Sequence, residues 1–233
     1  MTDHVHDLRS VREATERLLN AVAKLDNGSL SEESHLPGWS RGHVLAHLAR
    51  NADALVNVFE GRPMYESATA RDADIERDAG RPLEEHLTDL RDSWDRFLAT
   101  TERDQDWSRT VELRNGVTDL AANVPFRRWV EIELHHVDLN IGHGLSDLPD
   151  DFAEREIAFL ADRWSGRPEV PPVTLWLGYD GTGPAWHTGS AEGSPLTVAG
   201  TRAELLGWLA GRGDRGAHLT LIEGGPLPEL PPL

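Results

Sequence analysis

Two stretches of the sequence collect side chains that bind metal ions. The first carries His43 and His47, four residues apart, and the second carries Glu131 and His135 at the same spacing, followed by Asp138. An α-helix advances by about 100° per residue, so residues four apart project from neighbouring points on one face. Two helices that bring these faces together would offer imidazole nitrogens and carboxylate oxygens, which are donor atoms that hold zinc in proteins.

Two histidines and one carboxylate form a three-ligand set, which leaves the fourth position of a tetrahedral zinc ion open for water, substrate or an added thiol. The same spacing also occurs on solvated helix faces and in local ion pairs. Helix geometry alone therefore leaves the choice of ligands open, because residues of the same types lie nearby: His43, Glu133 and His136. The chain has no cysteine, so a thiol needed for chemistry must come from another molecule.

The stretches that carry these residues have the apolar periodicity of amphipathic helices. The first metal-binding stretch follows Ser40, a residue type that caps helix N-termini, and the second follows Pro125 and ends near Gly142. Four segments have this periodicity, at residues 6–26, 41–60, 82–98 and 125–141. They predict a helical bundle, a fold in which metal sites are often built from side chains on facing helices. Residues 108–120 are interpreted as a short hairpin or an extended excursion around Asn115-Gly116.

The pattern changes after Asp150. A helical segment at residues 151–166 is followed by strand-like segments, a second helix at 202–213 and a last strand at 218–224. This order predicts a small antiparallel or mixed sheet covered on one side. We therefore expect an α+β fold, with a metal-binding helical bundle at residues 1–150 and a smaller α+β domain at residues 151–233.

Composition excludes some classes of partner. The formal net charge of −17 is spread along the chain, and no basic stripe offers a footprint for nucleic acid. No apolar run approaches the roughly 18 residues of a membrane span, and the charged, amphipathic N-terminus does not resemble a signal peptide. These features predict a soluble, cytoplasmic protein, and we expect a monomer because the amphipathic helices can be satisfied within one chain.

Two motifs resemble those of the mycothiol-dependent maleylpyruvate isomerases, a family of DinB-like metalloenzymes. One is the turn Gly38-Trp39-Ser40-Arg41 before the first helix, and the other is an Arg-x-x-Glu-x-x-x-His-x-x-Asp-Leu run at residues 128–139. The resemblance implies a DinB-like four-helix bundle and selects three metal ligands, with zinc as the expected ion: His47, Glu131 and His135. It also makes Asp138 a candidate to orient His135 from behind the metal.

The resemblance extends to residues 63–71 and 210–213, which contain Arg71 and Arg212. Taken alone, Arg71 is an ordinary charge in a polar loop, and Arg212 is a cation near a helix C-terminus. The resemblance makes both arginines candidate catalytic residues that bind the carboxylates of a dianionic substrate. Tyr65, in the same loop as Arg71, is interpreted as a packing residue, and Trp39 as a residue at the entrance to the site.

The family resemblance also implies a reaction. It predicts cis–trans isomerisation of maleylpyruvate to fumarylpyruvate, in the gentisate route of aromatic breakdown, with mycothiol as the thiol cofactor. A mycothiol S-transferase acting on another electrophile is the nearest alternative, and a non-catalytic, zinc-containing regulator on the same scaffold is the next. The two arginines favour the isomerase, because an uncharged electrophile would not need them.

Overall fold

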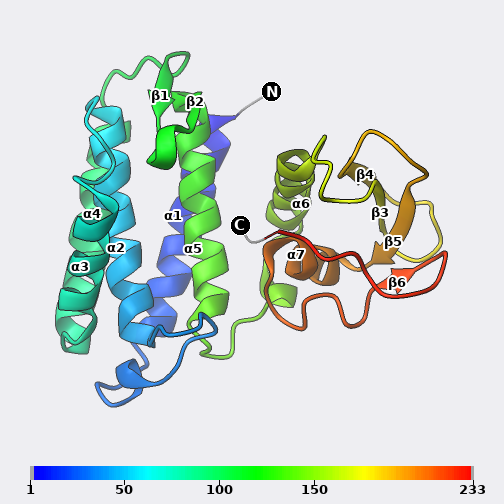
Figure 1. The fold of residues 1–233 in the computed structure, drawn as a ribbon. Helices are drawn as coiled ribbons and strands as arrows, with labels where there is room; N and C mark the ends of the chain where they lie inside the picture. Colours follow the sequence, from blue (N-terminus) through cyan, green and yellow to red (C-terminus); the bar gives the residue numbers. More distant parts are fainter. Residues whose placement is uncertain (1–2, 232–233) are drawn as a thin grey trace. The chain divides into compact units, whose positions relative to one another are not determined.

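A computed structural model describes residues 3–231 of the chain. It divides into two compact units that meet between Gly142 and His143, just before the boundary placed from the sequence. Helix α6 (Asp150–Trp164) belongs wholly to the second unit. Figure 1 shows the helices of the first unit and the smaller sheet of the second, and each unit is described by itself.

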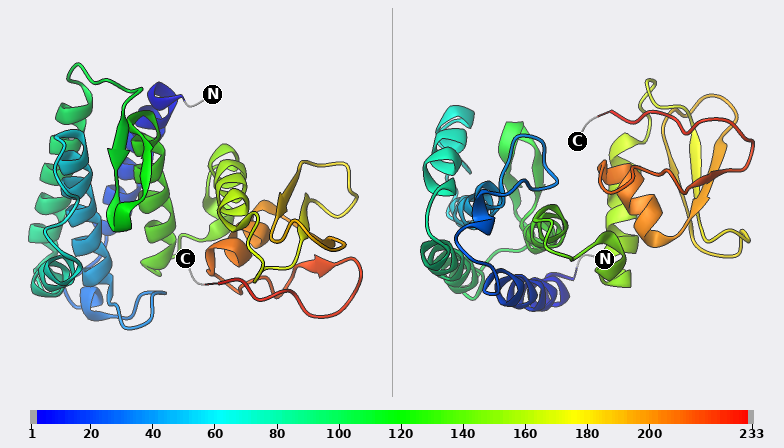
Figure 2. Two further views of the ribbon diagram at one scale, coloured as in Figure 1. Left: turned by 45° about the horizontal axis from the view of Figure 1, so that its top comes forward. Right: turned by 90° about the horizontal axis from the view of Figure 1, so that it is seen from below.

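Long helices run side by side in the first unit (Figures 1 and 2). They are α1 (His4–Val22), α2 (Arg41–Phe59), α4 (Leu83–Thr101) and α5 (Val124–Asp138). Helix α2 packs against α4 and α5, and α1 packs against α5. Their apolar stripes meet in a core that includes Leu18, Leu48, Phe97 and Ile132, each at most 1 % exposed. The predicted bundle is therefore confirmed.

A helix occupies the polar stretch that the sequence analysis interprets as a loop. Helix α3 (Ala68–Ala79) begins at Ser67, whose side chain accepts a hydrogen bond from the Ala70 N–H. It buries little apolar surface, chiefly Ile75 and Ala79, so its apolar periodicity is weak. The loop interpretation is wrong because ion pairs, and not an apolar stripe, hold this helix to its neighbours.

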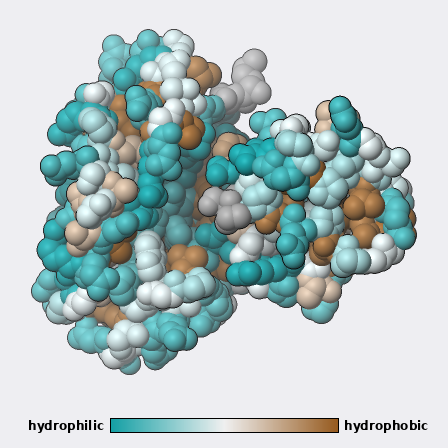
Figure 3. Space-filling model, viewed as in Figure 1, coloured by the Kyte–Doolittle hydropathy of each residue, from teal (hydrophilic) through white to brown (hydrophobic). Residues whose placement is uncertain are grey.

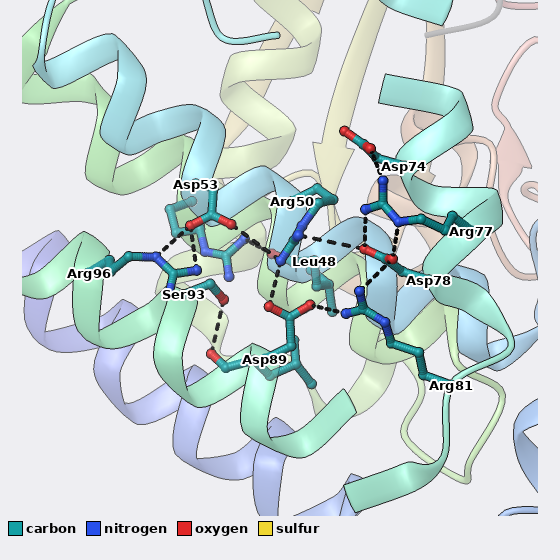
Figure 4. Close-up of polar contacts among 12 residues, drawn as sticks. Leu48, Arg50, Asp53, Asp74, Arg77, Asp78, Arg81, Asp89, Ser93 and Arg96 are labelled. Carbon is teal, nitrogen blue, oxygen red and sulfur yellow. Dashed lines mark hydrogen bonds and ion pairs between the residues drawn. The ribbon is translucent and has the colours of Figure 1, made fainter. Parts of the chain in front are cut away.

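Those ion pairs join α2, α3 and α4 (Figure 4). Asp78 of α3 is 1 % exposed and lies within 2.8 Å of Arg77 and Arg81 and 3.6 Å of Arg50 on α2. Arg50 also contacts Asp89 on α4 at 2.5 Å. A buried carboxylate costs free energy unless cations and hydrogen bonds surround it, and here three guanidinium groups do so. The network fixes the position of α3 on the bundle.

A hairpin lies between α4 and α5. Strands β1 (Thr110–Glu112) and β2 (Thr118–Leu120) pair antiparallel, with Val111 opposite Asp119. Asn115 and Gly116 make the turn with φ of 61° and 71°, a left-handed conformation that favours asparagine and glycine. Of the two interpretations of residues 108–120, the hairpin is the one observed.

The second unit is a mixed sheet with helices on one side, seen in the right view of Figure 2. The strand order is β4-β3-β5-β6, in which β3 and β5 run parallel and the other neighbours antiparallel. Helix α6 contacts β4 and α7, and α7 contacts β3 and β5. The α+β class is as predicted, and the elements are β3 (Val173–Leu177), β4 (Ala185–Thr188), β5 (Leu196–Gly200), α7 (Arg202–Ala210) and β6 (Thr220–Leu221).

Hydrophobic residues reach the surface in small, separate spots in the view of Figure 3, and hydrophilic residues dominate that view over α2, α3 and α4. None of the helices described here is long and apolar enough to cross a membrane.

Candidate metal centre

His47, Glu131 and His135 converge between α2 and α5. The His47 Nε2 atom lies 2.9 Å from Glu131 Oε2 and 3.0 Å from His135 Nε2, and the latter two atoms are 3.2 Å apart. Within the described part of the chain, they form the group of three metal-binding side chains whose ligand atoms all lie close together. The three ligands selected by resemblance thus meet at one point.

The spacing of these atoms fits a zinc ion. Bonds of about 2.0–2.1 Å to a tetrahedral ion place ligand atoms roughly 3.3 Å apart, close to the observed separations of 2.9–3.2 Å. The donor set of two imidazoles and one carboxylate also matches catalytic zinc sites. Glu131 keeps 31 % of its side chain exposed, whereas His47 keeps 7 %, so the cluster opens to solvent on the carboxylate side.

The Gly38-Trp39-Ser40-Arg41 turn sets the register between the two helices. Arg41 Nε donates to the Leu139 carbonyl at 2.9 Å, and another guanidinium nitrogen donates to the Asn140 carbonyl at 2.7 Å. These carbonyls follow the end of α5, where backbone oxygens lack partners within the helix. The contacts therefore fix the start of α2 against the end of α5. In this antiparallel register, His47 lies level with Glu131 and His135 along the two helices.

Arg128 adds a second connection between the same helices. It is 1 % exposed, and its Nη1 donates to the Leu48 carbonyl at 2.9 Å and to Asn51 Oδ1 at 2.7 Å, both on α2. Burial lowers the pKa of Arg128 to about 10, so the group remains cationic near neutral pH. In the sequence, Arg128 stands out only as part of a motif, although its place three residues before Glu131, on the side of the helix that faces the bundle, indicates this role.

The three ligands have different protonation tendencies. Burial lowers the pKa of His47 to about 4, so its imidazole is neutral near pH 7. Burial opposes the charged form of His135 as well, but the hydrogen bonds that His135 donates to Asp138 and Glu131 outweigh it and raise the pKa of His135. Burial likewise opposes the charge of Glu131, yet hydrogen bonds to His135 and His47 hold its pKa well below the usual range. Without a metal, the raised pKa of His135 and the lowered pKa of Glu131 favour an ion pair between these two residues, beside a neutral His47.

Asp138 supports His135 from the side opposite to the cluster. Its Oδ2 lies 2.8 Å from His135 Nδ1, and the residue is fully buried. A carboxylate at Nδ1 keeps the proton on that nitrogen and leaves Nε2 facing the cluster, which is the arrangement that metal-binding histidines usually show. The contact has the geometry that the sequence analysis expects for Asp138.

The competing residues point elsewhere. His43 Nδ1 lies 2.8 Å from the Ser40 hydroxyl and 3.2 Å from the Ser40 N–H at the start of α2, and its Nε2 faces Glu76. Glu133 is buried against Trp129 and Arg17, where it contacts α1. His136 is buried as well and is not part of the cluster. These residues therefore have structural surroundings of their own.

Arg71 contacts the cluster from α3. One guanidinium nitrogen lies 3.2 Å from His47 Nδ1, and the other pairs with Asp72 at 2.8 Å. The guanidinium carbon also lies 5.9 Å from the Trp39 ring centre and 5.7 Å from that of Tyr65, distances typical of cation–π contacts. Tyr65 packs against Arg71, as the sequence analysis expects, and Trp39 also lies 5.5 Å from the His47 ring.

Arg212 belongs to the second unit. It follows Gly211, which ends α7 in a left-handed conformation, and its Nη1 donates to the Ala210 carbonyl at 3.0 Å. This is the helix C-terminal position noted from the sequence, where a cation complements the helix dipole. The assignment of Arg212 to the active site remains a prediction.

The helical bundle and its cluster of two histidines and one carboxylate are the features of DinB-like metal-binding proteins. Residues 11–140 match the family model described as the mycothiol maleylpyruvate isomerase N-terminal domain. The chain therefore belongs to this family.

Two crystal structures resemble the whole chain. One is of the mycothiol-dependent maleylpyruvate isomerase, with a TM-score of 0.84 and 25% identity over 99% of this chain and 97% of that chain. The other is of a histidine-to-alanine mutant of such an enzyme, with a TM-score of 0.87 and 24% identity over the same shares. No curated protein sequence matches the chain.

Proposed function

We propose that this protein is a zinc-dependent enzyme that uses mycothiol to isomerise maleylpyruvate to fumarylpyruvate, a step of gentisate breakdown. The observation that carries the proposal is the open cluster of His47, Glu131 and His135 beside the Arg71 guanidinium. Family membership and the likeness to solved isomerases support the same reaction.

A thiol explains how the double bond turns. A thiolate adds to the carbon–carbon double bond, which is conjugated to carbonyl groups, and leaves a single bond that rotates. The thiolate then departs, the double bond re-forms in the trans geometry, and the thiol is regenerated without net oxidation. The chain has no cysteine, so the nucleophile must be supplied by a cofactor such as mycothiol.

His47, Glu131 and His135 would hold the metal, which, when bound, favours the thiolate form of a thiol at its open position. The two histidines must each present an unprotonated Nε2 to the metal. Asp138 fixes the His135 proton on Nδ1, and the low pKa of His47, about 4 because of burial, keeps that ring neutral. The ligand atoms already lie 2.9–3.2 Å apart, so a cation could bind once the Nε2 protons have moved or left.

Arg71 would bind a substrate carboxylate. A guanidinium only donates hydrogen bonds, so its 3.2 Å contact with His47 Nδ1 requires the histidine proton on Nε2. When Nε2 binds a cation, the neutral ring carries its proton on Nδ1 instead and no longer accepts from Arg71. With Nε2 so occupied, the Arg71 guanidinium would be free to bind an anionic ligand on a chain of net charge −17.

One assay separates this function from its alternatives. Zinc-loaded protein is mixed with maleylpyruvate, with and without mycothiol, and the ultraviolet spectrum is followed. Mycothiol-dependent conversion of maleylpyruvate that is lost in His47→Ala and retained in Arg91→Ala supports the proposal, because Arg91 is an exposed residue of α4. No conversion, with mycothiol consumed only by other electrophiles, would indicate a transferase, and neither activity would indicate a regulator.

A further inference from the structure

A pocket of about 420 Å³ lies at the end of α2 in the first unit. One wall is the loop of residues 61–67 between α2 and α3, and the other is the β1–β2 hairpin. Its volume falls in the range of small-molecule sites. The bundle needs only a short connection between α4 and α5, yet residues 102–123 form this hairpin. Long insertions of this kind commonly serve binding.

The two walls are fixed by hydrogen bonds. Arg109 on the hairpin donates to the Phe59 carbonyl at the end of α2 at 2.6 Å, and the Arg114 N–H lies 3.0 Å from the Met64 sulfur across the pocket. Asn57 of α2 donates to the Met64 carbonyl at 3.2 Å. The loop is therefore held both to the helix and to the hairpin, so the pocket exists before a ligand arrives.

Tyr65 connects the pocket lining to the side chains beside the metal centre. It lines the pocket, and its ring contacts the Arg71 guanidinium, which in turn lies 3.2 Å from His47 Nδ1. Burial raises the pKa of Tyr65, and the charge of Glu131 adds to this shift, so the phenol keeps its proton near neutral pH. A ligand that touches Tyr65 in the pocket is therefore two side-chain contacts from His47, through Tyr65 and Arg71, although the residues that line the pocket include none of the metal-binding cluster.

The lining suits a ligand with many hydroxyl groups. Hydroxyls donate and accept hydrogen bonds, and the pocket offers both partners, with guanidinium and amide donors beside hydroxyl and carboxylate acceptors: Arg62, Ser67, Thr110, Glu112, Arg114 and Asn115. The arginines of the lining outnumber its one carboxylate, Glu112. Arg62 is paired with Glu60 and Arg109 with the Phe59 carbonyl, so two of the cations are already engaged, and the neutral groups of Ser67, Thr110 and Asn115 add partners that suit hydroxyls.

We propose that this pocket binds the hydroxyl-rich body of the thiol cosubstrate, so that the sulfur extends past Tyr65 to the metal centre. The inference rests on the proposed function, because that function requires an external thiol. It assigns the hairpin to thiol recognition and leaves the substrate to Arg71 and the metal.

The kinetic test uses Glu112→Ala and Arg114→Ala, both at exposed positions on the hairpin. Each loses hydrogen bonds to the ligand, so we expect the KM for mycothiol to rise about tenfold. The KM for maleylpyruvate and kcat at saturating thiol should not change. Arg91→Ala, an exposed arginine outside the pocket, is the matched control and should leave all three constants unchanged. A rise in the KM for maleylpyruvate alone would overturn the proposal.

A binding test makes the inference independent of turnover. The probe is a mycothiol analogue in which alanine replaces the cysteine, titrated calorimetrically into the zinc-loaded protein. Binding to the wild type that weakens about tenfold in Arg114→Ala supports the pocket, even if the protein fails to isomerise maleylpyruvate. Equal affinity in both proteins refutes it, as does an Arg114-dependent affinity for maleate in place of the analogue.

Discussion

Replacing Arg71 with methionine should strengthen zinc binding while it weakens catalysis. In the metal-free site, the Arg71 guanidinium donates to His47 Nδ1, and this bond must break before His47 Nε2 can bind a cation with the ring neutral. The variant has no such bond to break and no positive charge beside the ion. Methionine keeps the apolar part of the side chain against Trp39 and Tyr65.

The size of the expected gain in zinc affinity follows from Coulomb's law. The guanidinium nitrogen is 3.2 Å from Nδ1, and an ion on Nε2 would lie on the far side of the ring, roughly 7 Å from that nitrogen. Charges of +1 and +2 at this separation repel by about 1.2 kcal/mol at the dielectric constant of water, and by about 5 kcal/mol at an effective value of 20. Asp72, 2.8 Å from the guanidinium, offsets part of this repulsion. We therefore take the lower figure, which corresponds to an increase of about sevenfold in zinc affinity.

Chelator competition at fixed pH measures this affinity, and Arg91→Met serves as the control because Arg91 is exposed on α4. The same variant should show a raised KM for maleylpyruvate, since it lacks the cation proposed to bind a carboxylate. Weaker zinc binding in Arg71→Met than in the control would refute the reasoning. It would mean that Arg71 stabilises the zinc-loaded site and does not oppose zinc binding.

Further predictions concern the surroundings of the cluster. Asp138→Asn should lower zinc affinity by about 10- to 100-fold with the helix content unchanged, as loss of a carboxylate behind a metal-binding histidine usually does, and chelator competition with circular dichroism measures both. The pKa of His135 is raised in the metal-free site because the hydrogen bonds that His135 donates to Asp138 and Glu131 outweigh burial, so zinc must displace a proton there. Affinity should therefore fall as the pH drops through that pKa, and calorimetry in two buffers of different ionisation enthalpy should detect the released proton; no proton release at pH 6 would contradict the raised pKa. Arg128→Met should lower the free energy of unfolding by about 1–3 kcal/mol, because Asn51 loses a buried donor; urea denaturation checks this, and an unchanged midpoint would exclude the bridging role.

The amphipathic helices of the bundle could be predicted from sequence because local spacing records which face each helix buries. Helix α3 could not. Ile75 and Ala79 are its buried apolar residues, and the ion pairs of Asp78 with Arg50 and Arg81 hold it in place. Arg50 belongs to α2 and Arg81 to the loop after α3, so no periodicity within residues 68–79 reveals these partners.

The choice of ligands shows the same limit. The helical spacing of His43 and His47 is equally suitable for a metal, and only the register between α2 and α5 decides which one meets Glu131. Contacts far apart in the sequence set that register, because Arg41 binds the Leu139 carbonyl. A family motif preserves the result of those contacts, which is why the resemblance could select His47 when the helical wheel could not.

Two arginines lie near the cluster, and their contacts assign them different tasks. Arg128 is held by two buried acceptors on α2, so moving it toward a ligand would leave the Asn51 amide oxygen without its donor, at a cost of about 1–3 kcal/mol. Arg71 is held by Asp72, which is 65 % exposed, and by a histidine nitrogen that stops accepting once the ring binds a cation through Nε2. Its release therefore costs little in the loaded site. Arg71 is therefore the cation that we propose to bind an anionic substrate, while Arg128 is a fixed link between the two helices that carry the proposed ligands.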